Sequence, residues 1–248
     1  MGSDAALLEL VSSANIACGG HAGDEQTMAA CVRQANAQSV AIGAHPGYCD
    51  RDNFGRLPQS LSAAALTKLI HEQVTRLQRI CQQEQARLRH VRAHGALGNL
   101  IDADTTAAQT LASTIADRFP TLAVMTLGGS FAEHEAKAKN LPVVRQFFAD
   151  RAYDNDGQLV SRKLEGSVLH DGPLILKRLL AVLDSGKLLS LQGKTIRVTF
   201  DSVCVHGDTP GALILAESIR KQLENNGVAI RPYHSSVISD QSLEGRSG

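Results

Sequence analysis

Short apolar runs alternate along the chain with longer segments in which apolar residues recur every three or four positions. Val40 to Ala44 and Thr121 to Leu127 are typical of buried strands, since they are short, continuous and bounded by polar or glycine residues. Leu61 to Gln85 carries an apolar stripe at helical spacing, and Ser60 or Ser62 can cap its start. Strands that alternate with amphipathic helices predict an α/β protein with a parallel sheet covered by helices.

The same pattern predicts the remaining elements. Six strands are expected, at Ala14 to Cys18, Val40 to Ala44, Leu88 to Ala93, Thr121 to Leu127, Val143 to Phe148 and Ile196 to Val205, with Val228 to Ile230 as a short seventh candidate. Helices are expected at Met1 to Val11, Asp24 to Asn36, Leu61 to Gln85, Asp102 or Asp104 to Phe119, Phe131 to Lys139, Pro173 to Asp184 and Thr209 to Asn226. Tyr153 to Gly166 contains the turn signal DNDG and is expected to form a turn or hairpin excursion.

Four of the strand-like runs have a histidine at their carboxyl end, within two residues of a glycine. The runs are SANIACGGHAGD with His21, VAIGAHPGY with His45, LRHVRAHGAL with His94 and SVCVHGDTP with His206. The carboxyl ends of parallel strands meet on one face, so these histidines predict a shared polar site there. Their dispersal over many strands favours a closed barrel, because an open sheet concentrates its ligand at one switch point.

Three interpretations of the four histidines stay open: a metal site, a proton-transfer cluster, or four separately packed side chains. A metal is possible but is not established, because the sequence has neither HExxH nor CxxC. Asp24, Asp150 and Asp208 each follow an expected strand and can orient a histidine or activate water. Helix capping is the alternative role, above all for Asp24 and Asp208.

Composition narrows the class of protein. With 248 residues, 43% of them hydrophobic, the chain suits one barrel-sized domain, expected at residues 1–230, followed by a polar tail at 231–248 that we expect to be disordered. Basic and acidic residues balance at 25 each, without a basic cluster, so nucleic acid is not an expected partner. No run approaches the roughly 20 apolar residues of a membrane span, and no secretory signal is evident. Five cysteines without a CxxC pair favour reduced thiols and a cytoplasmic location.

Five motifs identify the chain as resembling the LamB/YcsF family. They are SANIACGGHAGD, GAHPGY with NFGR, HGAL with Asn99, FADRAY with DGQLVSR, and CVHGDTPGA, in family order from Ser3 to Ile230. The resemblance implies a seven-stranded (β/α) barrel related to the glycoside hydrolase and polysaccharide deacetylase barrels. It also implies the role of the family's members, the A subunit of bacterial 5-oxoprolinase, which with B and C subunits opens the lactam ring of 5-oxo-L-proline to L-glutamate at the expense of ATP.

The resemblance also implies where catalysis and binding occur. Expected catalytic residues are His21, Asp24, His45, His94, Asp150, His206 and Asp208. Expected substrate-binding residues are Asn15, Arg56, Asn99 and Arg151, although loop arginines also form surface ion pairs. The chain has no GxGxxG or Walker A sequence, so the ATP is expected to be handled by other means or by the partner subunits.

The chain departs from the family pattern in several places. Family members begin with a strand resembling DLNADLGE, which this chain lacks, so we expect a barrel without its first strand and a gap or substitute segment beside Ala14 to Cys18. Arg92, Ala93 and Gly98 replace the family's lysine, proline and tyrosine, and Gln146 replaces its glutamate. A catalytically impaired paralogue that binds a ligand or partner subunit is therefore one alternative function. A metal-dependent deacetylase, suggested by fold analogy alone, is another.

Overall fold

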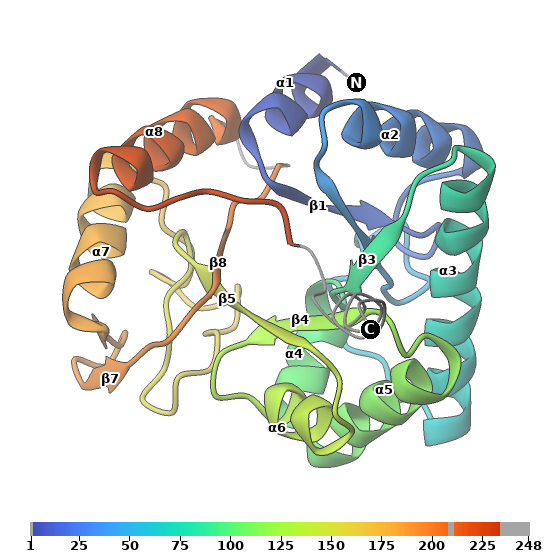
Figure 1. Ribbon diagram of the computed structural model, residues 1–248. Coiled ribbons are helices and arrows are strands. Elements are labelled where there is room, and N and C mark those ends of the chain that lie inside the picture. The colour runs from blue at the N-terminus through green and yellow to red at the C-terminus, as the bar shows by residue number, and fades with distance from the viewer. Residues whose placement is uncertain (1, 208–210, 234–248) are drawn as a thin grey trace, which may run out of the picture.

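Six parallel strands form a curled sheet at the centre of the molecule, with helices around it (Figure 1). The computed structural model describes residues 2–207 and 211–233. The strand order is β1 (Ser13–Ala17), β2 (Ala41–His45), β3 (Leu88–Val91), β4 (Ala123–Leu127), β5 (Val143–Phe148) and β8 (Ser202–Cys204). Each strand is parallel to its neighbours. The predicted parallel α/β architecture is therefore confirmed.

The helices follow the strands and cover the outside of the sheet. They are α1 (Gly2–Leu10), α2 (Glu25–Ala37), α3 (Ala63–Gln83), α4 (Gly95–Ala103), α5 (Thr105–Arg118), α6 (Phe131–Ala138), α7 (Gly172–Ser185) and α8 (Ala212–Asn225). The side chains of Asp24, Ser62 and Asp104 cap α2, α3 and α5 through the expected N–H groups. Helix α4 was not expected, because its sequence contains two glycines and is preceded by histidine, which is not a favoured N-cap residue; the N-cap His94 makes no side-chain capping bond.

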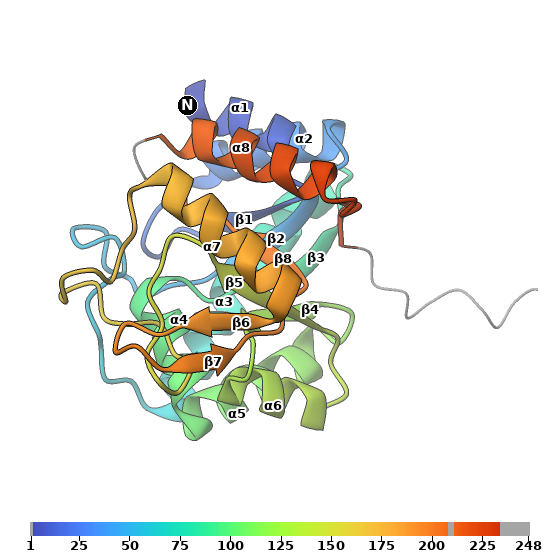
Figure 2. The same cartoon turned by 90° about the vertical axis from the view of Figure 1, so that its left-hand side faces the viewer.

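Two strand predictions are wrong. Ile196 to Val205 is not one strand: β7 (Thr195–Arg197) pairs antiparallel with β6 (Lys187–Leu189) in a hairpin beside α7, and β8 begins afterwards (Figure 2). The break occurs because Ile196 packs with the apolar side chains of α7, whereas Asp201 binds Arg145 on β5. Val228 to Ile230 forms no strand, because its apolar side chains pack against the same cluster.

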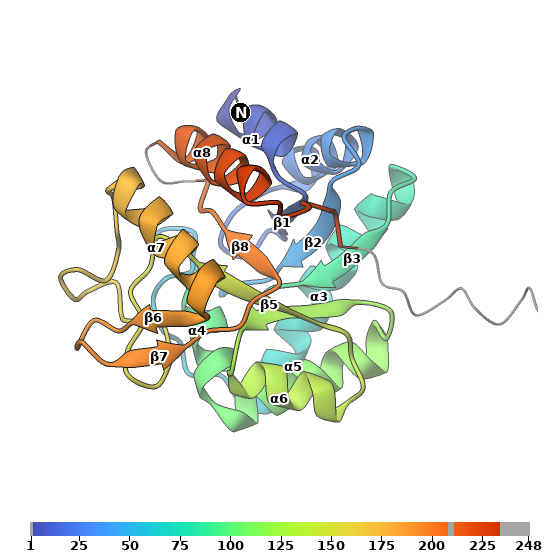
Figure 3. The ribbon, with the colours of Figure 1, turned by 60° about the vertical axis from the view of Figure 1, so that its left-hand side comes forward.

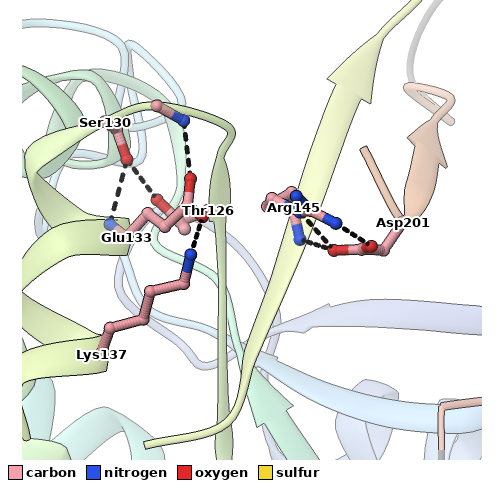
Figure 4. A network of polar contacts seen from close by, with 7 residues as sticks. Thr126, Ser130, Glu133, Lys137, Arg145 and Asp201 are labelled. Carbon is pink, nitrogen blue, oxygen red and sulfur yellow. Dashed lines mark hydrogen bonds and ion pairs between the residues drawn. The ribbon is translucent and has the colours of Figure 1, made fainter. Parts of the chain in front are cut away.

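Polar side chains fix the segments on both sides of β5 (Figure 4). The Arg145 guanidinium makes a fork to Asp201, with Nη2 to Oδ1 at 2.6 Å and Nε to Oδ2 at 2.8 Å, which sets the start of β8 on β5. At the start of α6, the Ser130 hydroxyl accepts from the Glu133 N–H, and the Glu133 carboxylate accepts from Lys137 at 2.5 Å.

The sheet is open between β1 and β8. Within residues 2–207 and 211–233, β1 pairs only with β2 and β8 pairs only with β5. Helices α1 and α8 lie side by side outside this opening (Figures 1 and 3), and Arg220 on α8 donates to the Leu10 carbonyl at 2.8 Å. The described strands thus form a curled half-barrel, and a complete seven-stranded barrel remains a prediction.

The expected polar tail begins inside the described part of the chain. Tyr233 packs against Ala123, Met125 and Val144 at the inner side of the sheet. Residues 234–248 lie outside the described residues, as do Asp208, Thr209 and Pro210. Within the described helices, none is both long and apolar enough to span a membrane.

Candidate active site

A cavity of about 1920 Å³ occupies the inside of the curled sheet and extends into the opening between β1 and β8. It collects most of the side chains that the sequence marked. Those that line it are Asn15, His21, His45, Arg56, His94, Asn99, Arg151 and His206. The four histidines at the strand ends therefore line one cavity, and their catalytic roles remain predictions.

Three histidines form one cluster on the β1 to β3 side of the cavity. The His21 and His94 rings stack, with centroids 3.7 Å apart and planes 10° apart. His45 stands edge-on to both rings. His94 Nδ1 lies 3.0 Å from His45 Nε2. The other nitrogen of each ring contacts a carbonyl oxygen. His45 Nδ1 lies 2.6 Å from the Arg92 carbonyl, and His94 Nε2 lies 2.8 Å from the Phe54 carbonyl.

Two glycines make room for the stacked ring of His21. A Cβ on Gly47 would lie 2.5 Å from His21 Nδ1, and a Cβ on Gly55 would lie 2.8 Å from His21 Cβ. Gly55 also has a positive φ of 63°, which side chains other than glycine rarely adopt. The loop glycines of the second motif are thus needed for histidine packing as well as for turning the chain.

The environment keeps two of these rings neutral. Burial, reinforced by His94 and by Arg51 and Arg56, lowers the pKa of His21 to about 3. Removal from bulk water, followed by the influence of His94 and His21, holds the pKa of His45 well below its usual range.

A second pair lies on the β5 and β8 side. The buried Asp150 accepts a hydrogen bond from His206 through Oδ2, 2.8 Å from Nδ1. An arginine nitrogen can only donate, so Arg162 Nη2, 3.4 Å away, requires His206 Nε2 to be an acceptor. His206 therefore carries its proton on Nδ1 and presents a lone pair on Nε2. The other oxygen of Asp150 is buried and has no protein partner.

Arg92 lies between the cluster of His21, His45 and His94 and the pair of His206 and Asp150. Its carbonyl accepts from His45, and its guanidinium lies 5.4 Å from the centre of the Phe148 ring, which in turn contacts His206. The guanidinium is held by a buried ion pair, Nη2 to Asp102 Oδ2 at 2.9 Å. Arg92 is thus fixed in place and connects both sides of the cavity.

Three of the expected residues are not placed as free groups in the cavity: one lies outside it, one lines it but binds backbone carbonyls, and one lies outside the described residues. Asp24 lies at the N-cap of α2, where its carboxylate accepts from the Thr27 N–H at 2.8 Å, and it does not line the cavity. Arg151 is buried and donates to the carbonyls of Val160 and Ser167, so it anchors the excursion that carries Arg162. Burial, together with Arg162, lowers the Arg151 pKa to about 10, which leaves the side chain cationic at neutral pH. Asp208 lies outside the described residues.

Sequence reasoning did not select His90 or Asp102. His90 Nε2 is 2.9 Å from the amide oxygen of Asn15, and Asp102 supports Arg92. The available signal for His90 was its place in LRHVRA, two residues before Arg92, because alternate residues of a strand face the same side. No local signal marks Asp102, which sits in the helix that was not expected.

Cationic side chains are among those that line the cavity. Arg56, Arg162 and Lys163 all line the cavity, and cationic side chains of this kind bind carboxylate or phosphate oxygens. In the described part of the chain, no three histidine, cysteine, aspartate or glutamate side chains are grouped so as to hold a metal ion.

Comparison with known proteins extends over nearly the whole chain. The sequence model of the LamB/YcsF family matches residues 1–237. The 5-oxoprolinase A subunit of Nitrobacter hamburgensis is 45% identical over 234 residues, which cover 94% of this chain and 92% of the relative. That of Paracidovorax citrulli is 42% identical over 233 residues, covering 94% and 93%. The crystal structure of the lactam utilization protein from Thermus thermophilus superposes with a TM-score of 0.85 at 36% identity, covering 93% of this chain and 92% of that one.

Proposed function

Because the chain belongs to the LamB/YcsF family, we propose that it is the A subunit of a 5-oxoprolinase. In this proposal it works with B and C subunits to hydrolyse the lactam of 5-oxo-L-proline to L-glutamate, coupled to ATP. The observation that supports this most is the presence of two hydrogen-bonded pairs at one cavity, His45 with His94 on the β1 to β3 side and His206 with Asp150 on the β5 and β8 side. Lactam hydrolysis needs a base for water and an acid for the ring nitrogen.

His206 is the proposed base. Asp150 accepts a hydrogen bond from the Nδ1–H group, which fixes the tautomer and leaves the lone pair on Nε2. This lone pair takes a proton from water when Arg162, now 3.4 Å from Nε2, binds the substrate instead. The carboxylate also stabilises the imidazolium that forms as the water oxygen attacks the carbonyl carbon. Arg162, next to Nε2, is placed to hold an anionic group of the substrate beside the attacking water.

The pair of His45 and His94 is the proposed acid, because its hydrogen bonds need an extra proton. Both outer nitrogens face carbonyl oxygens and must donate, and the contact between the two rings needs one more proton. Three protons are required, whereas two neutral imidazoles carry two. An anion bound beside Arg56 and Arg162 favours the third proton, which then passes to the ring nitrogen as the C–N bond breaks.

ATP, when bound, would supply a phosphoryl group to the lactam oxygen, which activates the carbonyl carbon towards water; after the C–N bond has broken, a second water would release the phosphate from the new carboxylate. Arg56, Arg162 and Lys163 are the residues of this chain that suit its phosphates, and the B and C subunits are proposed to provide the rest of the nucleotide site. We also propose that one more strand completes the barrel between β1 and β8. Its support is that, among the described residues, β1 and β8 each have an unpaired edge, and that apolar side chains of α1 and α8, among them Leu10 and Leu223, line the opening.

A second candidate is a binding subunit without turnover. Gln146 favours it, because this amide lines the cavity, is buried, and has an oxygen without a partner where the family pattern has an ionisable glutamate. Arg92 favours it too, since its guanidinium is engaged with Asp102 and cannot transfer a proton. The metal-dependent deacetylase remains a prediction that metal analysis of the purified protein tests. The five free cysteines are the support for the proposed cytoplasmic location.

The decisive experiment is release of glutamate from 5-oxoproline by this chain with B and C subunits and ATP. We expect turnover that is lost without ATP and falls about 10²-fold or more in His206→Gln, as general-base removal does. Glu217→Gln, an exposed change on α8, is the matched control. Binding of 5-oxoproline by calorimetry without turnover supports the binding subunit, and neither binding nor turnover refutes both functions.

A further inference from the structure

Three residues form a row across the inner face of the sheet. Asn15 on β1 is level with Gly43 on β2, and Gly43 is level with His90 on β3. Neighbouring strands are about 4.8 Å apart, so side chains on β1 and β3 must reach over β2 to meet. Ala17 and His45 pair two residues further along β1 and β2, and alternate residues of a strand face the same side. The row of Asn15, Gly43 and His90 therefore lies directly beneath the pair of His45 and His94.

Gly43 is what allows the two side chains to meet. A Cβ at this position would lie 2.0 Å from His90 Nε2 and 2.4 Å from His90 Cδ2, so the imidazole occupies the space of the absent side chain. The ring extends across β2 and brings Nε2 to 2.9 Å from the Asn15 amide oxygen. Gly43 does not have a positive φ, so glycine is needed at this position for the space that it leaves and not for its backbone conformation.

The buried position of His90 decides which nitrogen carries the proton. The residue is fully buried and its Nδ1 has no hydrogen-bond partner. Burial lowers its pKa to about 4, so the ring is neutral at physiological pH. A buried N–H without an acceptor is rarer than an acceptor without a donor, which places the single proton on Nε2. His90 therefore donates to the Asn15 oxygen.

This donation fixes the orientation of the Asn15 amide. With its oxygen occupied by His90, Asn15 has two N–H donors left, and the residue lines the cavity. We infer that His90 is a positioning residue that holds the Asn15 amide with its N–H groups towards the cavity, where they bind a carbonyl or carboxylate oxygen of the substrate. The inference rests on the proposed function for the identity of that substrate, a cyclic amide acid.

The test is a double-mutant cycle in the assembled enzyme, with 5-oxoproline as the substrate. His90→Leu removes the donor, His90→Gln keeps an N–H near the position of Nε2, and Asn15→Leu removes the group that is positioned. We expect His90→Leu to raise KM about tenfold with kcat within twofold, and His90→Gln to restore KM to within about threefold, because one oriented hydrogen bond corresponds to about this factor. In the Asn15→Leu background, His90→Leu should change KM no further.

A purely structural His90 gives a different result. An equal increase of KM in both backgrounds, or no increase in either, overturns the inference. His71→Leu on α3, where a partly buried histidine packs on Phe119, is the control for the general effect of replacing a histidine.

Failure of the proposed function is recognised separately, as a wild-type assembly that releases no glutamate. His90 is then judged by the NMR signal of the Asn15 side-chain amide, identified by its absence in Asn15→Leu. A shift of this signal in His90→Leu that is reversed in His90→Gln supports the positioning role, and an unchanged signal overturns it.

Discussion

The buried ion pair between Arg92 and Asp102 offers the most direct test of how the site is held together. Asp102, on α4, is 2% exposed and accepts from Arg92 Nη2 at 2.9 Å, from the Thr126 hydroxyl at 2.5 Å and from the Leu127 N–H at 3.4 Å. One carboxylate thus joins β3, α4 and β4. Replacing Asp102 with alanine removes all three bonds while the Arg92 side chain stays buried.

The magnitude follows from what remains unpaired. Breaking a buried pair by removing one partner costs about 3 to 5 kcal/mol, because the other charge is left without compensation. The Thr126 hydroxyl still has Ser130 as a partner, at 2.9 Å, so its contribution is smaller. Since domains are stable by only about 5 to 15 kcal/mol, Asp102→Ala should lose a large part of the free energy of unfolding.

Two further variants separate charge from shape. Asp102→Asn keeps an oxygen for Thr126 but loses the charge, and should cost about 1.5 to 3 kcal/mol, the value of a hydrogen bond to a charged group. The double change Arg92→Met with Asp102→Leu removes both charges, and should be within about 2 kcal/mol of the wild type because apolar side chains of similar volume replace the pair.

Urea unfolding followed by far-ultraviolet circular dichroism measures these free energies by linear extrapolation, with the m-value as a check on the denatured state. A loss of less than about 1 kcal/mol in Asp102→Ala refutes the argument. A double variant as unstable as Asp102→Ala also refutes it, because the cost would then come from packing.

Three other changes have defined outcomes. Asp150→Asn should lower kcat about 10²- to 10⁴-fold with little change in KM, because the neutral amide no longer stabilises the His206 imidazolium and its NH2 group can bind Nδ1, which would move the His206 proton to Nε2. A similar loss of kcat in a variant that changes both residues would confirm that they act as one unit. Lowering the pH from 6.5 to about 4 should destabilise the wild type, because the unfolded chain protonates His90 in this range while the folded chain does not. The stability that depends on neutral His90 is fully present above pH 6.5, and its loss, on the order of 3 kcal/mol, should be absent in His90→Gln. Urea midpoints compared across this range measure the difference, and parallel profiles of the two proteins would contradict the argument. Gly43→Ala should cost about 1 to 3 kcal/mol by displacing the His90 ring, as thermal unfolding would show, whereas an unchanged melting temperature would mean that the ring can move freely.

Much of the fold could be predicted from local pattern. The apolar stripe of Leu61 to Gln85 and the capping serine gave α3 to within two residues of its ends, because helix periodicity and N-caps are properties of neighbouring residues. The strand at Val143 to Phe148 matched β5 at both ends. The prediction of one continuous strand at Ile196 to Val205 failed because the break depends on Asp201 reaching Arg145, 56 residues away.

The candidate site shows the same division. The sequence located His21, His45, His94 and His206, since each follows an apolar run and has a glycine within two residues, and parallel topology then brings them to one cavity. It did not assign their partners.

What the sequence alone determined is the order of strands and helices and the set of histidines at the strand ends, because both depend on short-range pattern. The tertiary structure alone decided that Asp150 orients His206, that Asp102 holds Arg92, and that His90 reaches Asn15 from 75 residues away over Gly43. The physical reason is that hydrogen bonds between distant segments depend on strand register and on the space left by a missing side chain, and neither is encoded in any one stretch of residues.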